Sequence, residues 1–211
     1  MKSFLFITDF DGTITAQDFF QQILYRYEHD MVFNKSEKKG FNLLLDVFQE
    51  TNLTEKEFEE EVKHIPLDPN FAGFCNYVKN FGGDVLILSA GSKYYIEKKL
   101  EFEGIKDVGI LANGGFFENG KFKFIKNDEN GMFYDDEFGI NKKDVVLHYK
   151  NKYEKIAYAG DSYVDFEACK VSDLIFAKRN LAEILKICKI DFYDFYNFSD
   201  VIDVLKYLYK I

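Results

Sequence analysis

Short apolar runs that alternate with amphipathic segments are the strongest constraint on how this 211-residue chain can fold. Each run is only a few residues long and ends at a polar residue or a glycine turn, as buried parallel strands do. The segments between the runs repeat apolar residues at helical spacing, which is typical of crossover helices. The pattern therefore predicts an α/β fold with a parallel sheet covered by helices. The predicted strands are residues 4–8, 84–88, 108–111, 156–159 and 174–177.

The segment between the first two predicted strands is longer than a single crossover helix requires. Apolar residues recur at helical spacing within residues 19–24, 41–48 and 58–62, and Thr54 offers a helix cap before the last of these. Residues 70–80 suffice for the crossover helix itself. We therefore predict a helical cap at residues 16–68, inserted into a core formed by residues 1–15 and 69–211.

Two further elements have clear local signals. Asn119-Gly120 lies between the aromatic runs 116–117 and 122–124, and this arrangement predicts a tight β-hairpin as an excursion from the core. Residues 199–211 place apolar side chains on one face and predict a final helix.

Composition and charge exclude several classes of protein. The content of hydrophobic residues, 47%, predicts a packed globule, and the net charge of -9 argues against nucleic acid or an anionic membrane as a partner. Cys75, Cys169 and Cys188 are scattered, which favours buried free thiols over a disulfide or a zinc site. Because the chain has neither a signal-peptide pattern nor a membrane-spanning run, we expect a cytoplasmic protein of undetermined oligomeric state.

Polar side chains follow three of the predicted strands. They are Asp9, Asp11, Ser89, Asp161 and Asp165. The carboxyl ends of parallel strands share one edge of the sheet, so we expect these side chains to converge there. A lysine at position 142 or 143, on a helical segment before the fourth strand, can supply a balancing cation.

Converging carboxylates repel each other unless a cation holds them together. Magnesium prefers oxygen ligands and often keeps several waters, so it suits this set of residues. A calcium-binding loop would need a third acidic or amide residue before its glycine. Here Gly12 and Thr13 follow Asp11 at once, which excludes that loop. The sequence therefore predicts Mg²⁺ as the cofactor.

The sequence from Asp9 to Thr13, DFDGT, resembles the first motif of the haloacid dehalogenase superfamily. Ser89 resembles the second motif, Lys142 in its glycine-x-x-lysine context the third, and residues 160–165, GDSYVD, the fourth. The resemblance spans about residues 5–166 and implies a Rossmann-like core with strand order 54123 and a cap between the first two motifs. DFDGTITAQD and LANGGFF most resemble the branch that contains 2-hydroxy-3-keto-5-methylthiopentenyl-1-phosphate phosphatase and phosphoserine phosphatase.

The resemblance also implies a role for each motif residue. Asp9 would be the nucleophile that forms an aspartyl-phosphate, and Asp11 would be the general acid and then the general base. The implied magnesium ligands are the Asp9 carboxylate, the backbone carbonyl of Asp11, Asp161 and Asp165. The implied phosphate contacts are Ser89, Lys142 (or Lys143) and the backbone amides of Phe10, Asp11 and Ala90. Asp18 would lie where the cap begins and face the substrate, or else simply cap a helix.

We therefore expect a magnesium-dependent phosphomonoesterase that acts on a small phosphorylated metabolite. Dehalogenases of the superfamily do not need an acid two residues after the nucleophile, so Asp11 selects phosphate chemistry. Two alternatives remain open at this stage. A phosphotransferase or mutase would pass the phosphoryl group to a second alcohol, and a catalytically idle binding protein would keep the fold without turnover.

Overall fold

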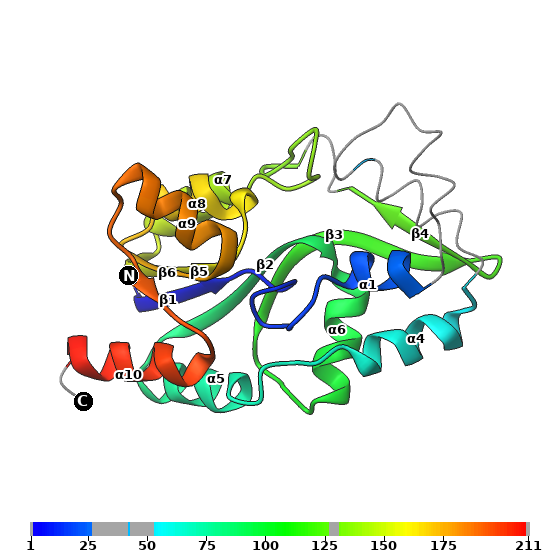
Figure 1. The fold of residues 1–211 in the computed structure, drawn as a ribbon, viewed down its shortest axis with the longest axis horizontal. Coiled ribbons are helices and arrows are strands. Elements are labelled where there is room, and N and C mark those ends of the chain that lie inside the picture. Colours follow the sequence, from blue (N-terminus) through cyan, green and yellow to red (C-terminus); the bar gives the residue numbers. More distant parts are fainter. Residues whose placement is uncertain (1, 27–41, 43–52, 127–130, 210–211) are drawn as a thin grey trace.

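The structure, a computed structural model, describes residues 2–26, 42, 53–126 and 131–209. A seven-stranded sheet forms its centre, with helices on both faces (Figure 1). The elements are β1 (Lys2–Thr8), α1 (Phe19–Arg26), α4 (Glu55–His64), α5 (Phe71–Asn80), β2 (Asp84–Ser92), α6 (Lys93–Phe102), β3 (Gly109–Glu118), β4 (Lys121–Ile125), α7 (Lys142–Lys150), β5 (Tyr153–Gly160), a 3₁₀ turn (Tyr163–Asp165), α8 (Phe166–Lys170), β6 (Leu174–Ala177), α9 (Arg179–Cys188), β7 (Tyr193–Asp194) and α10 (Phe198–Tyr209).

The strand order across the sheet is β4-β3-β2-β1-β5-β6-β7. All neighbouring strands pair in parallel except β3 and β4. The α/β class is confirmed, and the five strands expected from the sequence follow one another as β6-β5-β1-β2-β3. The full order differs from the expected 54123 because β4 and β7 extend the sheet at its two edges.

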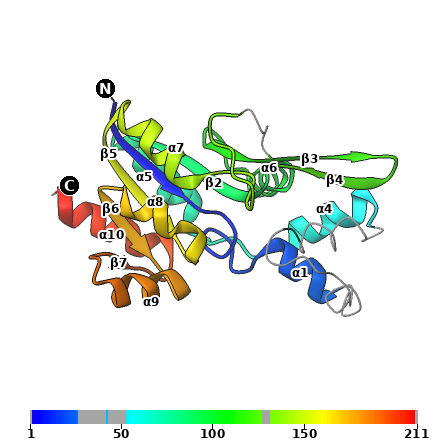
Figure 2. The ribbon, with the colours of Figure 1, turned by 90° about the horizontal axis from the view of Figure 1, so that it is seen from above.

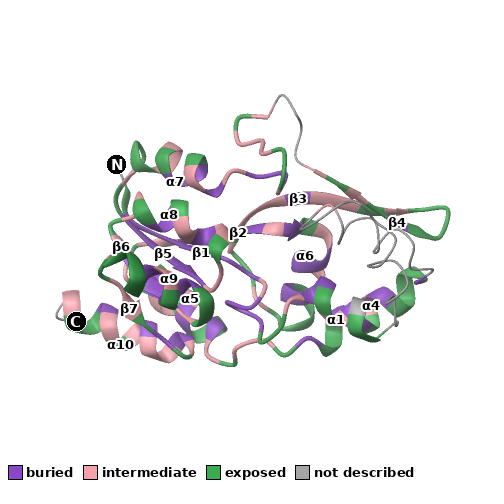
Figure 3. Cartoon of the chain, turned by 45° about the horizontal axis from the view of Figure 1, so that its top comes forward, coloured by how far each residue is buried: buried purple, intermediate pink, exposed green. Residues whose placement is uncertain are grey.

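The central strand β1 is apolar on both faces because each face of the sheet is covered. Phe4 and Phe6 point into the hydrophobic cluster that includes residues of α5, α6 and α10. Leu5 and Ile7 point into the opposite cluster, with residues of α7, α8 and α9. Figure 3 shows the central strands as predominantly buried. Each such side chain contributes about 1.5–3 kcal/mol when fully buried, so β1 anchors the loop that follows it.

Helices α1 and α4 form part of the segment predicted to be a cap. They lie beside the β3–β4 hairpin (Figures 1 and 2). Helix α4 begins with a capping box between Thr54 and Glu57, and it buries Phe58 and Val62. The apolar pattern predicted at residues 41–48 falls outside the described residues except for position 42. The division into cap and core therefore stays a prediction.

The predicted hairpin is present, but its first arm is the continuation of a core strand and not a separate strand. Strand β3 runs without interruption from its pairing with β2 to its pairing with β4. Asn119 and Gly120 form the turn with φ angles of 52° and 75°, as a tight hairpin with two left-handed residues requires. The Phe58 ring of α4 stacks on Phe122 with the centroids 4.8 Å apart, so the hairpin packs against the helical segment.

The cysteines are free thiols, as expected, but they are not all buried. Cys169 is buried and Cys75 is half-buried, whereas Cys188 is exposed because it ends α9 on the side that faces solvent. Within the described residues, we find no helix with both the length and the apolar character needed to cross a membrane.

Candidate active site

The sheet register brings the ends of three strands to one edge. Thr8, the last residue of β1, pairs with Ile87 of β2 and Ala159 of β5. The Asp9 amide then donates to the Ala159 carbonyl at 2.9 Å, which continues the pairing for one residue. Asp9 therefore emerges between Ser89 and Asp161, as the alternation of strands and helices predicted.

Three carboxylates meet at this edge. Asp9, Asp161 and Asp165 each offer one oxygen within 4.8 Å of the others. Burial raises the pKa of Asp9 to about 7, although Lys142 opposes the shift, and the charge of Asp165 adds to it. Burial and the charge of Asp165 also raise the pKa of Asp161 to about 6. The site therefore holds more negative charge than its buried lysine balances, which fits a hard divalent cation.

Lys142 is the lysine that reaches these carboxylates. Its Nζ donates to Asp9 Oδ1 and to Asp165 Oδ1, both at 2.7 Å. Burial disfavours the charged ammonium, but the two carboxylates outweigh this effect and raise the pKa of Lys142. Lys143, the alternative from the sequence, has a side chain that is 42% exposed and lies 3.7 Å from Glu167. The geometry therefore favours Lys142 as the lysine of the site.

Asp165 is fully buried and fixed by several donors. Its Oδ1 accepts from the Tyr158 hydroxyl at 2.7 Å, and its Oδ2 accepts from the amides of Asp161 and Ser162 at 3.3 and 3.2 Å. Asp165 thus caps the short turn that it belongs to and also faces Lys142. Tyr158 has no signal in the sequence, because it is one of 14 tyrosines and alternates with apolar residues in a buried strand.

Asp11 is held by two elements that lie outside the sheet. Its Oδ1 accepts from the Phe19 amide at the start of α1, at 3.0 Å, and its Oδ2 accepts from the Tyr95 hydroxyl of α6. Burial and the nearby charge of Asp18 raise the pKa of Asp11 well above its ordinary value, against these two hydrogen bonds. Tyr95 is fully buried and stacks on Phe19, with ring centroids 4.6 Å apart. A Cβ at Gly91 would overlap the Tyr95 hydroxyl.

The loop after β2 is fixed by internal hydrogen bonds. Ser89 is buried, and its hydroxyl accepts from the Gly91 amide at 2.9 Å. Asn113 Nδ2 donates to the carbonyls of Ala90 and Phe138, both at 2.7 Å. Asn113 therefore ties the Ser89 loop to the segment that leads into α7. Sequence reasoning missed this residue, because Asn113 lies beyond the predicted strand 108–111 and only the observed β3 includes it. A buried asparagine needs such partners.

Gly12 must be glycine for two reasons. Its φ angle is +77°, a conformation that side chains rarely adopt, and a Cβ would overlap the Asp161 carboxylate. The turn after Asp11 thus allows the first and fourth motifs to come into contact.

A cavity of about 640 Å³ opens beside Asp11 and Asp161. Asp18 lines it, and the same side chain accepts from the Gln21 amide at 2.9 Å, as a helix cap does. Its contact with substrate stays a prediction. Arg179 closes one side, with NH1 3.4 Å from Asp161 Oδ2 and NH2 donating to the Ala16 carbonyl at 2.6 Å. The remaining lining residues are Gly12, Ala16, Gln17, Gln21, Gln22, Tyr25 and Ser162.

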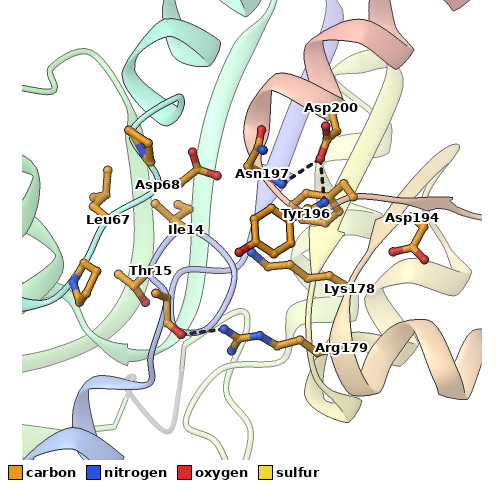
Figure 4. Close-up of a pocket in the computed structure, with 14 residues that line it drawn as sticks. Ile14, Thr15, Leu67, Asp68, Lys178, Arg179, Asp194, Tyr196, Asn197 and Asp200 are labelled. Carbon is orange, nitrogen blue, oxygen red and sulfur yellow. Dashed lines mark hydrogen bonds between the residues drawn. The ribbon is translucent and has the colours of Figure 1, made fainter.

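A second cavity of about 640 Å³ shares Ala16 and Arg179 with the first. Figure 4 shows Lys178 and Arg179 extending toward the loop that carries Ile14 and Thr15. Lys178 Nζ donates to the Thr13 carbonyl at 2.7 Å and lies 5.0 Å from the centre of the Phe195 ring. The hydrogen bond from Lys178 therefore holds the loop of the first motif on the side of the second cavity.

Comparisons with known proteins confirm the resemblance to phosphatases of the haloacid dehalogenase superfamily. A family model described as Putative Phosphatase matches residues 4–191. The chain therefore belongs to this family.

Curated relatives and solved structures agree with this assignment. The 2-hydroxy-3-keto-5-methylthiopentenyl-1-phosphate phosphatase of Brevibacillus brevis is 24% identical over 191 residues, and the match covers 86% of each chain. The polyol phosphate phosphatase PYP1 of Saccharomyces cerevisiae is 28% identical over an alignment of 208 residues. The match covers 85% of this chain and 81% of PYP1. A structure of a phospho-aspartyl intermediate analogue of phosphoserine phosphatase is similar with a TM-score of 0.69 and 21% identity, covering 98% of this chain and 99% of that one. The structural similarity shows the fold.

Proposed function

We propose that this phosphatase is a magnesium-dependent phosphomonoesterase that acts on a small phosphorylated metabolite through an aspartyl-phosphate at Asp9. The observation that carries the proposal is the buried Asp9 carboxylate, which lies against Lys142 and within reach of Asp161 and Asp165. The cavity of about 640 Å³ beside this cluster has a volume suited to a small ligand. The names of the relatives, which refer to phosphorylated metabolites, also support the proposal.

In the first half-reaction, an oxygen of Asp9 attacks phosphorus and the bond from phosphorus to the alcohol oxygen breaks. Asp11 gives its proton to the departing alcohol, and its raised pKa supports this role because the carboxyl must be protonated beforehand. In the second half-reaction, Asp11 takes a proton from water, and the water oxygen attacks the phosphorus of the intermediate. The bond from phosphorus to the Asp9 oxygen breaks, phosphate leaves, and the Asp9 carboxylate is regenerated.

The other residues of the site would bind the phosphoryl group. Ser89, Lys142 and the amides of Phe10, Asp11 and Ala90 are the proposed contacts to its oxygens. Asp9, Asp161, Asp165 and the Asp11 carbonyl would hold the magnesium ion, which supplies positive charge when it is bound. Fixed charges and donors of this kind account for most of the catalysis of phosphoryl transfer.

Metal removal tests the proposal directly. After dialysis against a chelator, hydrolysis of p-nitrophenyl phosphate should fall by about a thousandfold, because the cation contributes several kcal/mol to charge stabilisation. Added Mg²⁺ should restore the rate, and all of the phosphoryl group should appear as inorganic phosphate. Full activity in excess chelator would contradict the proposed cofactor, and transfer of phosphate to added glycerol would indicate a phosphotransferase.

The Tyr95 hydroxyl should orient Asp11 as the acid. We expect Tyr95→Phe to lower kcat/KM for phenyl phosphate about fivefold more than for p-nitrophenyl phosphate. Removing one hydrogen bond costs about 1 kcal/mol. Phenol is a poorer leaving group than p-nitrophenol, so its departure depends more on proton donation by Asp11. Tyr94→Phe is the matched control, since the Tyr94 hydroxyl donates to Glu55 at 2.7 Å instead. Equal losses for both substrates would show that Tyr95 serves only in packing.

A further inference from the structure

We infer that one face of α1 selects phosphate esters whose leaving alcohol carries hydroxyl groups, and disfavours alcohols that carry a carboxylate. The inference rests on the proposed function and specifies the substrate class of the same site.

Helix α1 divides its side chains between the core and the cavity. Phe19, Phe20 and Ile23 are buried in the hydrophobic core. The cavity-lining residues of this segment are Asp18, Gln21, Gln22 and Tyr25, with Gln17 just before the helix. Positions 18, 21, 22 and 25 are three or four residues apart, so they share one helical face. This face lines the same cavity as Asp11 and Asp161.

The chemistry of this face matches hydroxyl groups. An amide side chain both donates and accepts hydrogen bonds, and so does a phenolic hydroxyl. Gln17, Gln21 and Tyr25 are therefore able to pair with an alcohol in either direction, whereas Gln22 Nε2 already donates to Glu61 Oε2 at 3.3 Å. The Asp18 carboxylate adds an acceptor for an O–H donor. Uncharged donors and acceptors of this kind would bind several hydroxyl groups of a polyol or hydroxyketone.

The charges around the cavity disfavour a carboxylate on the leaving alcohol. Asp11, Asp18 and Asp161 line the cavity, together with Arg179. Arg179 already contacts the Asp161 carboxylate and the Ala16 carbonyl. In the proposed mechanism Asp11 is protonated and Asp161 would hold the magnesium ion, so Asp18 is the like charge that a substrate carboxylate would meet. Like charges that are brought together cost several kcal/mol.

The other described cations near the cavity are also engaged. Arg26 contacts Glu61 with NH1 at 2.6 and 2.7 Å from the two carboxylate oxygens, and it does not line the cavity. Lys142 lies between Asp9 and Asp165. Lys178 donates to the Thr13 carbonyl beside the second cavity. Over the described ranges, none of these groups offers a substrate carboxylate the paired donors of an unengaged arginine.

Two matched pairs of substrates test the inference. Glycerol 3-phosphate and 3-phosphoglycerate differ only by a hydroxymethyl group in place of a carboxylate. We expect kcat/KM to be at least about tenfold higher for glycerol 3-phosphate, because of the like-charge contact. 2-Hydroxyethyl phosphate and 2-phosphoglycolate form the second pair with the same difference, and the member without the carboxylate should again be preferred.

Two variants locate the selectivity on α1. Asp18→Asn removes the charge but keeps an oxygen that can cap the helix, so the glycerol 3-phosphate preference should shrink about fivefold or more. Gln21→Lys supplies a cation and should shrink the preference in the same direction. Glu183→Gln on α9 is the matched control for a lost negative charge, since its side chain is 67% exposed and lies outside both cavities.

The outcomes separate this inference from the proposed function. If p-nitrophenyl phosphate is hydrolysed in an Asp9-dependent manner but 3-phosphoglycerate or 2-phosphoglycolate is preferred to its uncharged partner, only the inference is overturned. The inference alone is also overturned if neither glycerol 3-phosphate nor 2-hydroxyethyl phosphate is hydrolysed. It is likewise overturned if both variants keep the wild-type ratio of kcat/KM for glycerol 3-phosphate to kcat/KM for 3-phosphoglycerate. If no phosphate ester shows Asp9-dependent hydrolysis, the proposed function itself is wrong.

Discussion

Asp9→Asn should reduce turnover of every phosphate ester by at least about a thousandfold, because an amide cannot replace the carboxylate as the nucleophile. The fold should persist, since asparagine has nearly the same shape and its side-chain oxygen can still accept from Lys142 or Thr13, which contact Asp9 in the structure. Steady-state kinetics and circular dichroism measure the two effects.

The control for this substitution is Asp203→Asn on α10. The Asp203 side chain is 75% exposed. Helix α10 lies at the opposite end of the fold from α1 (Figure 1). This variant should keep wild-type kinetics. If Asp9→Asn kept wild-type turnover on an active substrate, the covalent mechanism would be wrong.

The largest effect on stability is expected for Lys142→Met. The substitution leaves the buried carboxylates of Asp9 and Asp165 without their shared ammonium group. Removing one partner of a buried ion pair costs about 3–5 kcal/mol, so the free energy of unfolding should fall by that amount in metal-free buffer. Added Mg²⁺ should recover part of the loss, because a cation bound only by the folded state stabilises it. Urea denaturation with and without Mg²⁺ measures both changes.

Lys143→Met on the same helix is the matched control. The Lys143 side chain is 42% exposed and lies 3.7 Å from Glu167, so the change should stay within about 0.5 kcal/mol. Equal destabilisation by the two variants would mean that the Lys142 contacts add nothing beyond the propensity and packing of α7.

The core strands and their common edge could be predicted because they depend on local patterns. The apolar runs identify β1, β2 and β5, and parallel pairing then requires Asp9 and Asp161 to lie close together. Strand β7 could not be predicted, because two residues carry no periodic signal. The continuity of β3 into the hairpin was missed because glycines 114 and 115 interrupt the apolar run.

The contacts that orient the site depend on tertiary packing. Lys142 and Lys143 are adjacent, and only the rotation of α7 against the sheet decides which one is buried. Tyr95 is one tyrosine among many aromatic residues, so nothing in the sequence marks it as the partner of Asp11. Arg179 is one of only two arginines in the sequence, but its link between Asp161 and the Ala16 carbonyl depends on the fold.

Asp11 connects chemistry and substrate recognition. One of its oxygens accepts from the first turn of α1, the helix whose other residues face the cavity. A shift of α1 would therefore change the position of the proposed acid together with the binding face. This coupling predicts that substitutions at the start of α1 affect kcat as well as KM.

Formation of a covalent bond between Asp9 and phosphorus is the central claim, and beryllium fluoride with Mg²⁺ tests it as a mimic of the phosphoryl group. Fluorine NMR of the purified protein should show a bound fluoride resonance that needs Mg²⁺ and disappears in Asp9→Asn. The same bound resonance in Asp9→Asn, or turnover by a wild-type protein that never acquires it, would contradict the account.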